Sequence, residues 1–489
     1  MKTFKNIFTT SLIVTIILCS SSCKKFYDIN ADPDAILEAP LPTILTSATV
    51  NIGYFSGSDL NRYSSLIMQQ FSGQSTGTLN QTQQYEKYEI TGNDANNLFS
   101  TAYATILNDL ETIITRGTAE GSPHYTGEAK ILKAYMYQTL VDAFGDLPYS
   151  ESQKLTLNLA PKYDDDEAIY TAIIALCDQG IAEVNAAVSK QSPGSNSTIY
   201  PGTFATTKTN WVKFANTLKL RLFLHYSEKN AAFTTSSMNT LINAGAQFLG
   251  SNADNFQMAF VNAASARNPF DSFETGRPGY LVANNTLLTM MDSQNDPRRA
   301  AYFTAFATAP FYRGAKGGDP GNAPLYSKLH TYLRGALVGA AYSGAAPVRM
   351  LTFAEYNFIR AEAALRFGIT SGGTAQSFFA AGITASLTDA GVAAVDQSTY
   401  LAASGTLTGS NTEQLKQIIE QKYIASYGLI MEPWTDWRRT GFPAITPPVN
   451  ALVTTVPRSL YYPQSEIDYN PNAKQKTSLS VRTFWDTRP

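Results

Sequence analysis

Apolar residues that recur every three or four positions are the feature that most restricts how this chain can fold, because that interval is the period of an α-helix. In the segment Glu128–Phe144, the residues Leu132, Tyr135 and Leu140 form one such stripe. Gly145 follows directly, and a glycine after the last apolar position is a common helix stop. The same pattern returns along most of the chain and predicts a mainly α-helical fold.

Several predicted helices begin with a Ser, Thr or Asp that is followed three residues later by Glu. This pattern satisfies backbone N–H groups in the first helical turn and therefore marks a helix start. It occurs at Asp164 with Glu167, at Thr352 with Glu355, and at Ser410 with Glu413.

The predicted helices follow one another in pairs. Two such pairs are Leu98–Ile114 with Glu128–Phe144, and Asp164–Val188 with Thr209–Tyr226. Helical pairs that stack on one another form a solenoid. A strict repeat of roughly 34 residues is missing, so we expect degenerate tetratricopeptide-like units.

Between residues 250 and 350 the helical spacing weakens, and Gly, Pro, Asn and Ser accumulate. This stretch is predicted to be a loop-rich insertion, and loops on a rigid scaffold commonly carry binding groups. We expect a signal peptide, 1–22, and one domain, 23–489. The expected parts of the domain are a first helical-repeat part (24–249), the insertion (250–350), later helical repeats (351–443) and a C-terminal segment (444–489).

The N-terminus indicates export. Cys23 follows two lysines, an apolar run from Ile7 to Leu18 and three serines, which is the order of a signal peptide. The apolar run is shorter than the ~20 residues that span a bilayer, so a transmembrane anchor is the weaker interpretation. Small residues directly before a cysteine resemble the lipobox of bacterial lipoproteins, in which Cys23 becomes the first mature residue and carries acyl chains such as palmitate. Two acyl chains make a stable membrane anchor. The alternative is a soluble-secretion signal, after which Cys23 is an ordinary thiol.

The cysteines exclude a disulfide within the mature chain. Cys19 leaves with the signal and Cys23 carries lipid, which leaves Cys177. Cys177 falls on an apolar helical face with Ile173 and Ile181, so we expect a core residue and not a reactive thiol.

The charge balance disfavours nucleic acid as a partner. Lys and Arg number 37, Asp and Glu number 39, and charged residues make up only 16% of the chain, whereas aromatic residues make up 12%. A surface of this kind makes its contacts through amides, hydroxyls and aromatic faces. It suits neutral polar ligands.

The chain lacks the motifs of common catalytic and metal sites, so no cofactor and no metal are predicted. His124, His225 and His330 have no Cys or acidic partner at ligand spacing. A calcium site at Asp292, Asn295 and Asp296 lacks the EF-hand pattern. Glycoside hydrolysis needs two carboxyl groups, and three pairs in the sequence have the right residue types: Asp292 with Asp296, Glu432 with Asp436, and Glu466 with Asp468. Each pair is more simply explained by a turn or a helix start.

Two clusters combine aromatic rings with polar side chains, as sugar-binding surfaces do. The first runs from Tyr54 through Arg62 and Tyr63 into the Gln/Thr/Asn-rich stretch 73–97, and the second covers 268–280. These segments lie outside the helical stripes, so no helix partner is demanded for their rings. The predicted ligand-binding residues are Tyr85, Tyr88, Phe270, Phe273, Arg277 and Tyr280.

The chain resembles a known family, the SusD/RagB nutrient-binding outer-membrane lipoproteins, and within that family the SusD-like group. The resemblance rests on the lipobox Cys23 and on segments that occur in the family's order. They are Glu128–Tyr137 running to Phe144-Gly-Asp-Leu-Pro-Tyr149, Trp211–Leu224, Thr352–Ala363, Glu432-Pro-Trp-Thr-Asp-Trp-Arg-Arg-Thr-Gly-Phe-Pro443, and Arg458–Glu466.

The resemblance implies a lipid-anchored α-solenoid with tetratricopeptide-like repeats at the outer membrane. It implies that the protein forms a lid over a SusC-like TonB-dependent transporter. The lid captures oligosaccharides or, in some relatives, peptides, and it is not catalytic. Ligand contacts vary across the family, so no binding residue is carried over. We interpret Trp434 and Trp437 as packing residues.

The leading hypothesis is therefore a non-catalytic lipoprotein at the cell surface that binds oligosaccharides and delivers them to the transporter. Three alternatives remain open: a peptide-binding member of the same family, a glycan-degrading enzyme, and a solenoid adaptor that binds only proteins.

Overall fold

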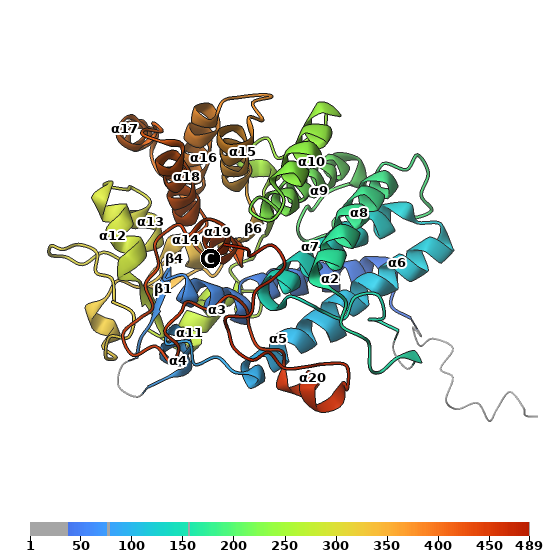
Figure 1. The fold of residues 1–489 in the computed structure, drawn as a ribbon, viewed down its shortest axis with the longest axis horizontal. Coiled ribbons are helices and arrows are strands. Elements are labelled where there is room, and N and C mark those ends of the chain that lie inside the picture. The colour runs from blue at the N-terminus through green and yellow to red at the C-terminus, as the bar shows by residue number, and fades with distance from the viewer. Residues whose placement is uncertain (1–37, 76–78, 155–156, 489) are drawn as a thin grey trace, which may run out of the picture. The chain divides into compact units, whose positions relative to one another are not determined.

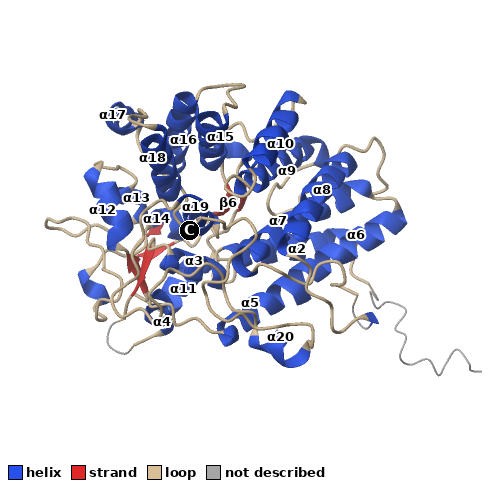
Figure 2. Ribbon diagram, in the orientation of Figure 1, coloured by secondary structure: helices blue, strands red, loops and turns tan. Residues whose placement is uncertain are grey.

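Helices dominate the part of the chain that the structure describes (Figures 1 and 2). The computed structural model describes residues 38–488 except 76–78 and 155–156. The predicted signal peptide and Cys23 lie outside the described residues. Residues Leu41–Pro489 form one compact unit, and everything below concerns that unit. Its helices confirm the mainly α-helical fold expected from the apolar spacing.

The first helical part contains long helices and a run of short ones. The long helices are α2 (Leu41–Ser56), α6 (Asn108–Glu120), α7 (Pro123–Phe144), α8 (Asp166–Val184), α9 (Phe204–His225) and α10 (Ala231–Asn243). The short elements are α3 (Asp59–Ile67), β1 (Phe71–Gly73), α4 (Gln81–Glu86), η1 (Gly92–Ala95), α5 (Asn96–Ser100) and η2 (Thr101–Leu107).

Consecutive helices in this part pack side by side. The predicted helix Leu98–Ile114 is the run α5, η2 and α6, and it packs against α7. The predicted pair Asp164–Val188 and Thr209–Tyr226 corresponds to α8 and α9, which also pack together. Because α7 contacts both α6 and α8, the helices form a continuous stack.

The residues 250–350 hold short helices and strands joined by loops. They are η4 (Asn252–Asp254), β2 (Phe256–Met258), α11 (Pro269–Gly276), β3 (Leu281–Ala283), α12 (Asn285–Ser293), α13 (Arg299–Tyr302), η5 (Ala323–Leu325), α14 (Thr331–Arg334), β4 (Leu337–Val338), β5 (Ala341–Tyr342) and β6 (Val348–Leu351). The strands pair antiparallel as β1 with β3, β2 with β6 and β4 with β5.

Longer helices return after β6. They are α15 (Phe353–Phe367), α16 (Ala375–Asp389), α17 (Ala394–Ser404), α18 (Asn411–Ala425) and α19 (Glu432–Thr440), followed by the short α20 (Gln464–Tyr469). Helix α15 packs against both α16 and α18. None of the helices in the described residues has the length and apolar content needed to cross a bilayer.

Two of the three predicted helix starts are confirmed and one is shifted. The Thr352 hydroxyl accepts from the Glu355 amide over 3.1 Å, and Ser410 with Glu413 forms a reciprocal cap. At α8 the cap is Asp165, whose side chain accepts from the Ala168 amide. Asp164 instead accepts from backbone amides of the loop that follows α7. The prediction of Asp164 as the cap is wrong because its carboxylate accepts from the Tyr149 and Ser150 amides instead.

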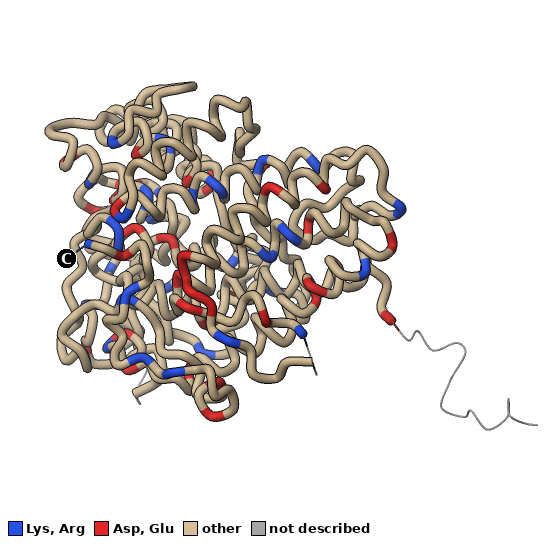
Figure 3. The backbone as a smooth tube through the Cα atoms, turned by 45° about the vertical axis from the view of Figure 1, so that its right-hand side comes forward, with Lys and Arg blue, Asp and Glu red and all other residues tan. Residues whose placement is uncertain are grey.

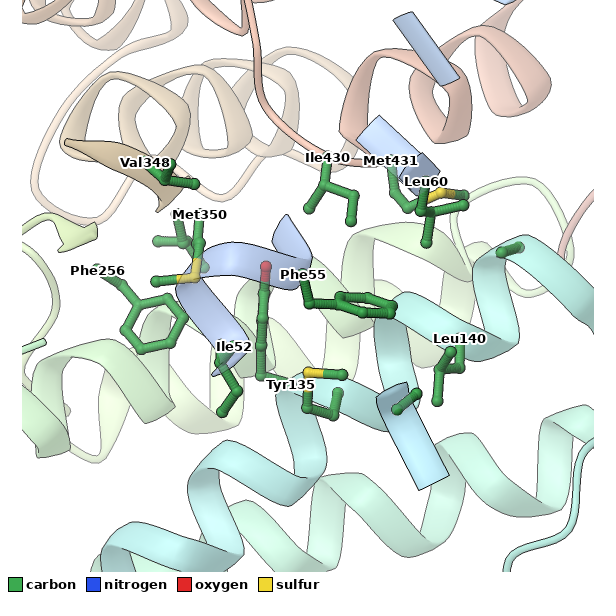
Figure 4. Packing of buried hydrophobic residues seen from close by; sticks show 14 of the residues in the cluster. Ile52, Phe55, Leu60, Tyr135, Leu140, Phe256, Val348, Met350, Ile430 and Met431 are labelled. Carbon is green, nitrogen blue, oxygen red and sulfur yellow. The ribbon is translucent and has the colours of Figure 1, made fainter. Parts of the chain in front are cut away.

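The main core joins the first helical part to the insertion and to the segment before α19. Figure 4 shows its side chains directed toward one another from several elements. They are Ile52 and Phe55 of α2, Leu60 of α3, Tyr135 and Leu140 of α7, Phe256 of β2, Val348 and Met350 of β6, and Ile430 and Met431. One core therefore fixes the loop-rich segments against the helical stack.

Residues expected to pack do so. Trp434 is fully buried, and its indole Nε1 donates to the Pro457 carbonyl over 2.8 Å. Trp437 is buried as well. Cys177 is free and buried, and burial raises the pKa of its thiol to about 12, which keeps it protonated and unreactive.

Candidate ligand-binding pocket

The short sheet of β1 and β3 brings together two segments that are far apart in the sequence. Phe71 lies opposite Ala283 and Gly73 lies opposite Leu281. The polar stretch that follows Gly73 therefore runs beside the turn that precedes Leu281. These are the two aromatic and polar clusters recognised in the sequence.

A pocket of about 310 Å³ lies between the two clusters. Its walls come from α3, α4, η1, α5, α11 and the turn after α11. The lining residues are Asp59, Arg62, Tyr63, Gln81, Thr82, Tyr85, Asn93, Asp94, Asn97, Phe273, Arg277 and Tyr280.

Helix α4 is held by a reciprocal cap. The Asn80 side chain accepts from the amides of Thr82 and Gln83, at 3.0 and 3.3 Å, while the Gln83 side chain accepts from the Asn80 amide. The Thr82 hydroxyl also donates to the Tyr280 carbonyl over 2.7 Å. The cap and this hydrogen bond fix the orientation of α4, which carries Tyr85 into the pocket wall.

Asp94 organises the wall next to α4. One carboxylate oxygen accepts from the Tyr85 hydroxyl at 2.8 Å, and the other accepts from the amide and hydroxyl of Thr91, at 2.8 and 2.7 Å. The Asp94 carbonyl accepts from the Tyr63 hydroxyl, and the Tyr63 and Tyr85 rings meet edge to face. Burial raises the pKa of both phenols above their usual range, so both remain neutral.

Phe273 forms the aromatic part of another wall. The guanidinium groups of Arg62 and Arg277 lie 4.3 and 5.3 Å from the centroid of its ring, and the Tyr280 ring meets it edge-on at 6.2 Å. Arg62 is also paired with Asp59. This wall offers ring surfaces together with N–H donors.

A buried carboxyl group supports the turn behind each ring-bearing segment. Glu274 follows Phe273 and accepts from the amides of Gly279 and Leu281, at 3.4 and 3.2 Å. Burial raises the pKa of Glu274 to about 7.

Glu86 plays the same part beside Tyr85. It accepts from the Ser72 hydroxyl at 2.6 Å and from the Gly318 amide at 3.4 Å. Burial raises the pKa of Glu86 to about 7. The backbone on both sides of the pocket is therefore held by carboxyl groups that titrate near neutral pH.

A smaller pocket of about 220 Å³ adjoins the first and shares Asp59 and Asn97 with it. Its other lining residues are Tyr54, Phe55, Ser58, Leu60, Leu98 and Thr101.

The structure brings four of the six predicted ligand-binding residues together. Tyr85, Phe273, Arg277 and Tyr280 line the pocket, although they come from two distant segments. Arg277 is exposed, and Phe273 and Tyr280 are half-buried.

Tyr88 and Phe270 lie elsewhere, and the expectation that their rings are available at a surface is wrong. Tyr88 is 1% exposed and Phe270 is 3% exposed. Phe270 lies on the inner side of α11, where it meets Phe71 of β1 edge to face. Tyr88 lies two residues after α4 with a left-handed backbone, φ +66°, and its ring belongs to the core.

Sequence reasoning did not single out the polar residues of the pocket. Asp59 and Asp94 resemble ordinary helix-start residues, and the amide side chains lie in the polar stretch whose aromatic members alone were selected. The composition of that stretch was the available signal. The amide side chains in question are Gln81, Asn93 and Asn97.

The carboxylate pairs considered for catalysis are engaged elsewhere. Glu432 and Asp436 are buried and pair with Lys422 at 3.5 and 2.8 Å. Glu466 accepts from the Tyr163 hydroxyl at 3.2 Å, and Asp468 accepts from the side-chain amide of Gln464.

The calcium candidate is occupied by arginines. Both oxygens of Asp296 accept from the Arg298 side chain, at 2.9 and 3.1 Å from its Nε, and Asp292 pairs with Arg299. These contacts use the oxygens that a calcium ion would need.

Two groups of side chains in the described residues bring possible metal ligands within 4.8 Å of one another. Asp142, His225 and Glu432 form one, but Arg221 and Lys422 already pair with Glu432. The positive charge of these side chains opposes a cation.

Asp146, Asp165 and Asp166 form the other group. Each accepts a hydrogen bond from a backbone amide: Asp146 from Asp166, Asp165 from Ala168, and Asp166 from Phe484. These carboxylates serve the start of α8 and the C-terminal segment.

The other two histidines make local contacts. The His124 ring stacks on Phe204 with centroids 4.0 Å apart. The Nδ1 atom of His330 lies 2.7 Å from the Tyr342 hydroxyl. Neither belongs to the two groups of possible metal ligands.

A helical stack with a polar, aromatic-lined pocket built mainly from short helices defines the class of helical binding scaffolds. Comparisons with known proteins narrow the class to a family. Residues 33–463 match a family model described as SusD-like, starch-binding associating with outer membrane. The chain belongs to this SusD-like family, as the resemblance in its sequence predicted.

Solved structures with the same fold include a chitin-binding protein, with 23% identity, a TM-score of 0.78, and coverage of 92% of this chain and 100% of that one. A chitin-binding SusD homologue from Flavobacterium johnsoniae has 22% identity, a TM-score of 0.74, and coverage of 92% and 98%. A SusD-like protein from Bacteroides thetaiotaomicron has 23% identity, a TM-score of 0.75, and coverage of 91% and 98%. A comparison with curated protein sequences gives no match.

Proposed function

We propose that this protein is a non-catalytic lipoprotein of the cell surface that captures oligosaccharides in the pocket between α4 and α11 and delivers them to a SusC-like TonB-dependent transporter. The pocket carries the proposal, because it combines the Phe273, Tyr280 and Tyr85 rings with amide, hydroxyl and guanidinium groups. Aromatic rings stack on the apolar faces of sugar rings, and the polar groups satisfy their hydroxyls.

The family and two of the solved relatives support this proposal. The family is described as starch-binding and associating with the outer membrane, and two structures of the same fold are chitin-binding proteins. The lipobox at Cys23 supports an anchor in that membrane. Cys23→Ala is expected to move the protein out of the outer-membrane fraction.

The engagement of the pocket acids favours binding over glycan hydrolysis. Asp59 is paired with Arg62, and both oxygens of Asp94 accept hydrogen bonds from Tyr85 and Thr91. A glycosidase needs one carboxyl group that gives a proton and one free carboxylate across the sugar bond. The peptide-binding alternative shares the pocket but has no observation in its favour.

The binding proposal is tested with the double variant Phe273→Ala/Tyr280→Ala. Both side chains are half-buried, so the fold is expected to tolerate their loss. Stacking contributes about 0.5–1.5 kcal/mol for each ring beyond area burial. Removal of both rings should weaken binding of a glycan selected from a polysaccharide panel by roughly tenfold to a hundredfold.

The matched control is Phe311→Ala, an exposed phenylalanine outside the pocket. We expect it to bind like the parent, and all three proteins to melt at similar temperatures. Unchanged affinity in the double variant would contradict the pocket assignment. Sustained product release from any glycan would contradict the non-catalytic role, and capture of a transporter without binding of any glycan would favour the adaptor.

A further inference from the structure

Arg277 is the charged side chain of the pocket that has neither an ion-pair partner nor a hydrogen-bond partner among the described residues. Its guanidinium lies over the Phe273 ring, 5.3 Å from the centroid. Within the described residues, its side chain forms no ion pair and donates no hydrogen bond, although the residue is exposed. The other arginine of the pocket, Arg62, is paired with Asp59.

The two acids of the pocket contact groups other than Arg277. Asp59 is held by Arg62. The oxygens of Asp94 accept from the Tyr85 hydroxyl and from the amide and hydroxyl of Thr91, at 2.7 to 2.8 Å. The oxygens of both pocket acids therefore already accept from other groups, whereas the N–H groups of the Arg277 guanidinium have no acceptor among the described residues and are available to a ligand.

The position of Arg277 is set by its surroundings. Its amide donates to the Phe273 carbonyl over 2.8 Å at the end of α11, and the Glu274 carboxyl holds the following turn through Gly279 and Leu281. Contact with an aromatic face orients a guanidinium and leaves its N–H groups at the edge of the plane. Those N–H groups match the two oxygens of a carboxylate.

We propose that the ligand of this pocket is an acidic oligosaccharide, in which a uronic acid carboxylate pairs with Arg277 while a neighbouring sugar face stacks on the aromatic wall. The inference rests on the proposed function, because it names the chemical class of glycan for the same pocket. It differs from the expectation drawn from composition, which favoured neutral ligands.

The test uses the mature protein and a glycan array that carries several sugar backbones in pairs. The members of a pair differ only in whether C6 is a hydroxymethyl group or a carboxylate, as in galactose oligomers and oligogalacturonates. A hydrogen bond to a charged group contributes about 1.5–3 kcal/mol. The acidic member of the best pair is therefore expected to bind roughly tenfold to a hundredfold more tightly.

Arg277→Gln should abolish this preference, so that the acidic and neutral members of the pair bind with the same affinity. Arg277→Lys keeps the charge without the planar fork and should retain part of the preference. The matched control is Arg313→Gln, because Arg313 also lies over a phenylalanine ring, 4.0 Å from the centroid of Phe306, but outside the pocket. Added salt should weaken binding of the acidic member and not of the neutral one.

The outcomes separate this inference from the proposed function. If only neutral glycans bind, or if Arg277→Gln keeps the acidic preference, the inference is overturned while glycan capture stands. If no glycan binds, or if acidic peptides alone bind through Arg277, the proposed function fails and the inference fails with it.

Discussion

Two regions of the molecule hold arginines among acidic side chains, and they use these charges differently. The first is a buried charge network between α9, α15, α18 and α19, which comprises Arg221, Glu355, Glu362, Lys422, Glu432, Asp436 and Arg439. The second is the pocket, where Arg62 is paired but Arg277 is not. Every member of the network has a partner of opposite charge, whereas the pocket keeps one charge available.

The difference follows from burial. Arg221 is 2% exposed and donates to both oxygens of Glu355 at 2.7 Å, because an unpaired charge in the interior would cost several kcal/mol. A charge at the rim of a pocket stays hydrated and needs no partner. Figure 3 shows basic and acidic positions interspersed along the chain, so the sign pattern alone does not distinguish the two regions. Pairing in the interior serves the fold, and a free charge at the rim is available for recognition.

The largest effect is expected when the buried network is broken. Arg221→Met leaves Glu355 and Glu432 without their shared partner and should lower the free energy of unfolding by about 3–5 kcal/mol. Urea unfolding at neutral pH measures the change. Arg277→Gln is the matched control and should stay within about 0.5 kcal/mol of the parent. Equal losses in the two variants would remove the distinction between the regions.

An intermediate effect concerns pH, with opposite signs in the two regions. In the network, burial would raise the pKa of Glu362, but Arg439 and Arg366 lower it to about 2 from 4.5. Because the pKa of Glu362 is lower in the fold than in the unfolded chain, the ionised carboxylate stabilises the fold at pH values above 4.5. This stabilisation is lost as the pH falls from 4.5 to about 2. At the pocket, burial raises the pKa of Glu274 to about 7, so its stabilisation is present below 4.5 and is lost as pH rises to 7.

Between pH 5 and pH 8, ionisation of Glu274 should therefore lower the free energy of unfolding of the parent by about 2–3 kcal/mol. Glu274→Gln should not show this loss, because Gln does not ionise. Glu362→Gln should leave that range unchanged and flatten the acid limb instead. Urea unfolding at pH values from about 2.5 to about 8, in steps of about one unit, compares the three proteins. The comparison fails if both variants alter the same range of pH.

The smallest effect concerns two helix caps of the same kind. Asn80→Ala removes the cap of α4 beside the pocket, and Ser410→Ala removes the cap of α18 in the scaffold. Each should cost about 1 kcal/mol in urea unfolding. Calorimetric titration with the glycan chosen by the panel should show weaker binding only for Asn80→Ala, because α4 carries Tyr85. Weaker binding in Ser410→Ala would mean that the scaffold cap also controls the pocket.

Local interactions explain what could be predicted from the sequence. The helix Glu128–Phe144 lies within α7, and the cap of Ser410 and Glu413 forms as expected, because apolar spacing and capping act over a few residues. The burial of Cys177 follows from its place on an apolar stripe. Where two neighbouring acceptors could cap the same helix, as Asp164 and Asp165 could at α8, the same rules miss the helix start by one residue.

The pocket was predictable in its ingredients and not in its assembly. The sequence marked Tyr85, Phe273, Arg277 and Tyr280 as rings and charge in polar segments, but it assigned Tyr88 and Phe270 to the same surface. Tyr88 and Phe270 are 1% and 3% exposed and line no part of the pocket, whereas Tyr85, at 7% exposed, is also buried but forms part of the pocket wall. Phe270 faces the core where it meets Phe71 of β1, and helical spacing contains no information about that strand.

By itself, the sequence determined that this chain is a stack of helices with polar, aromatic loops, because short-range periodicity and capping fix secondary structure. Only the tertiary structure decided which loops meet. The pairing of β1 with β3 joins residues 71–73 to residues 281–283 and so builds one pocket from two distant segments. Tertiary packing also decided that Glu432 and Asp436 neutralise Lys422 in the interior while Arg277 is left at the rim. Long-range contacts of this kind depend on which elements dock, and that choice is made by the shared core.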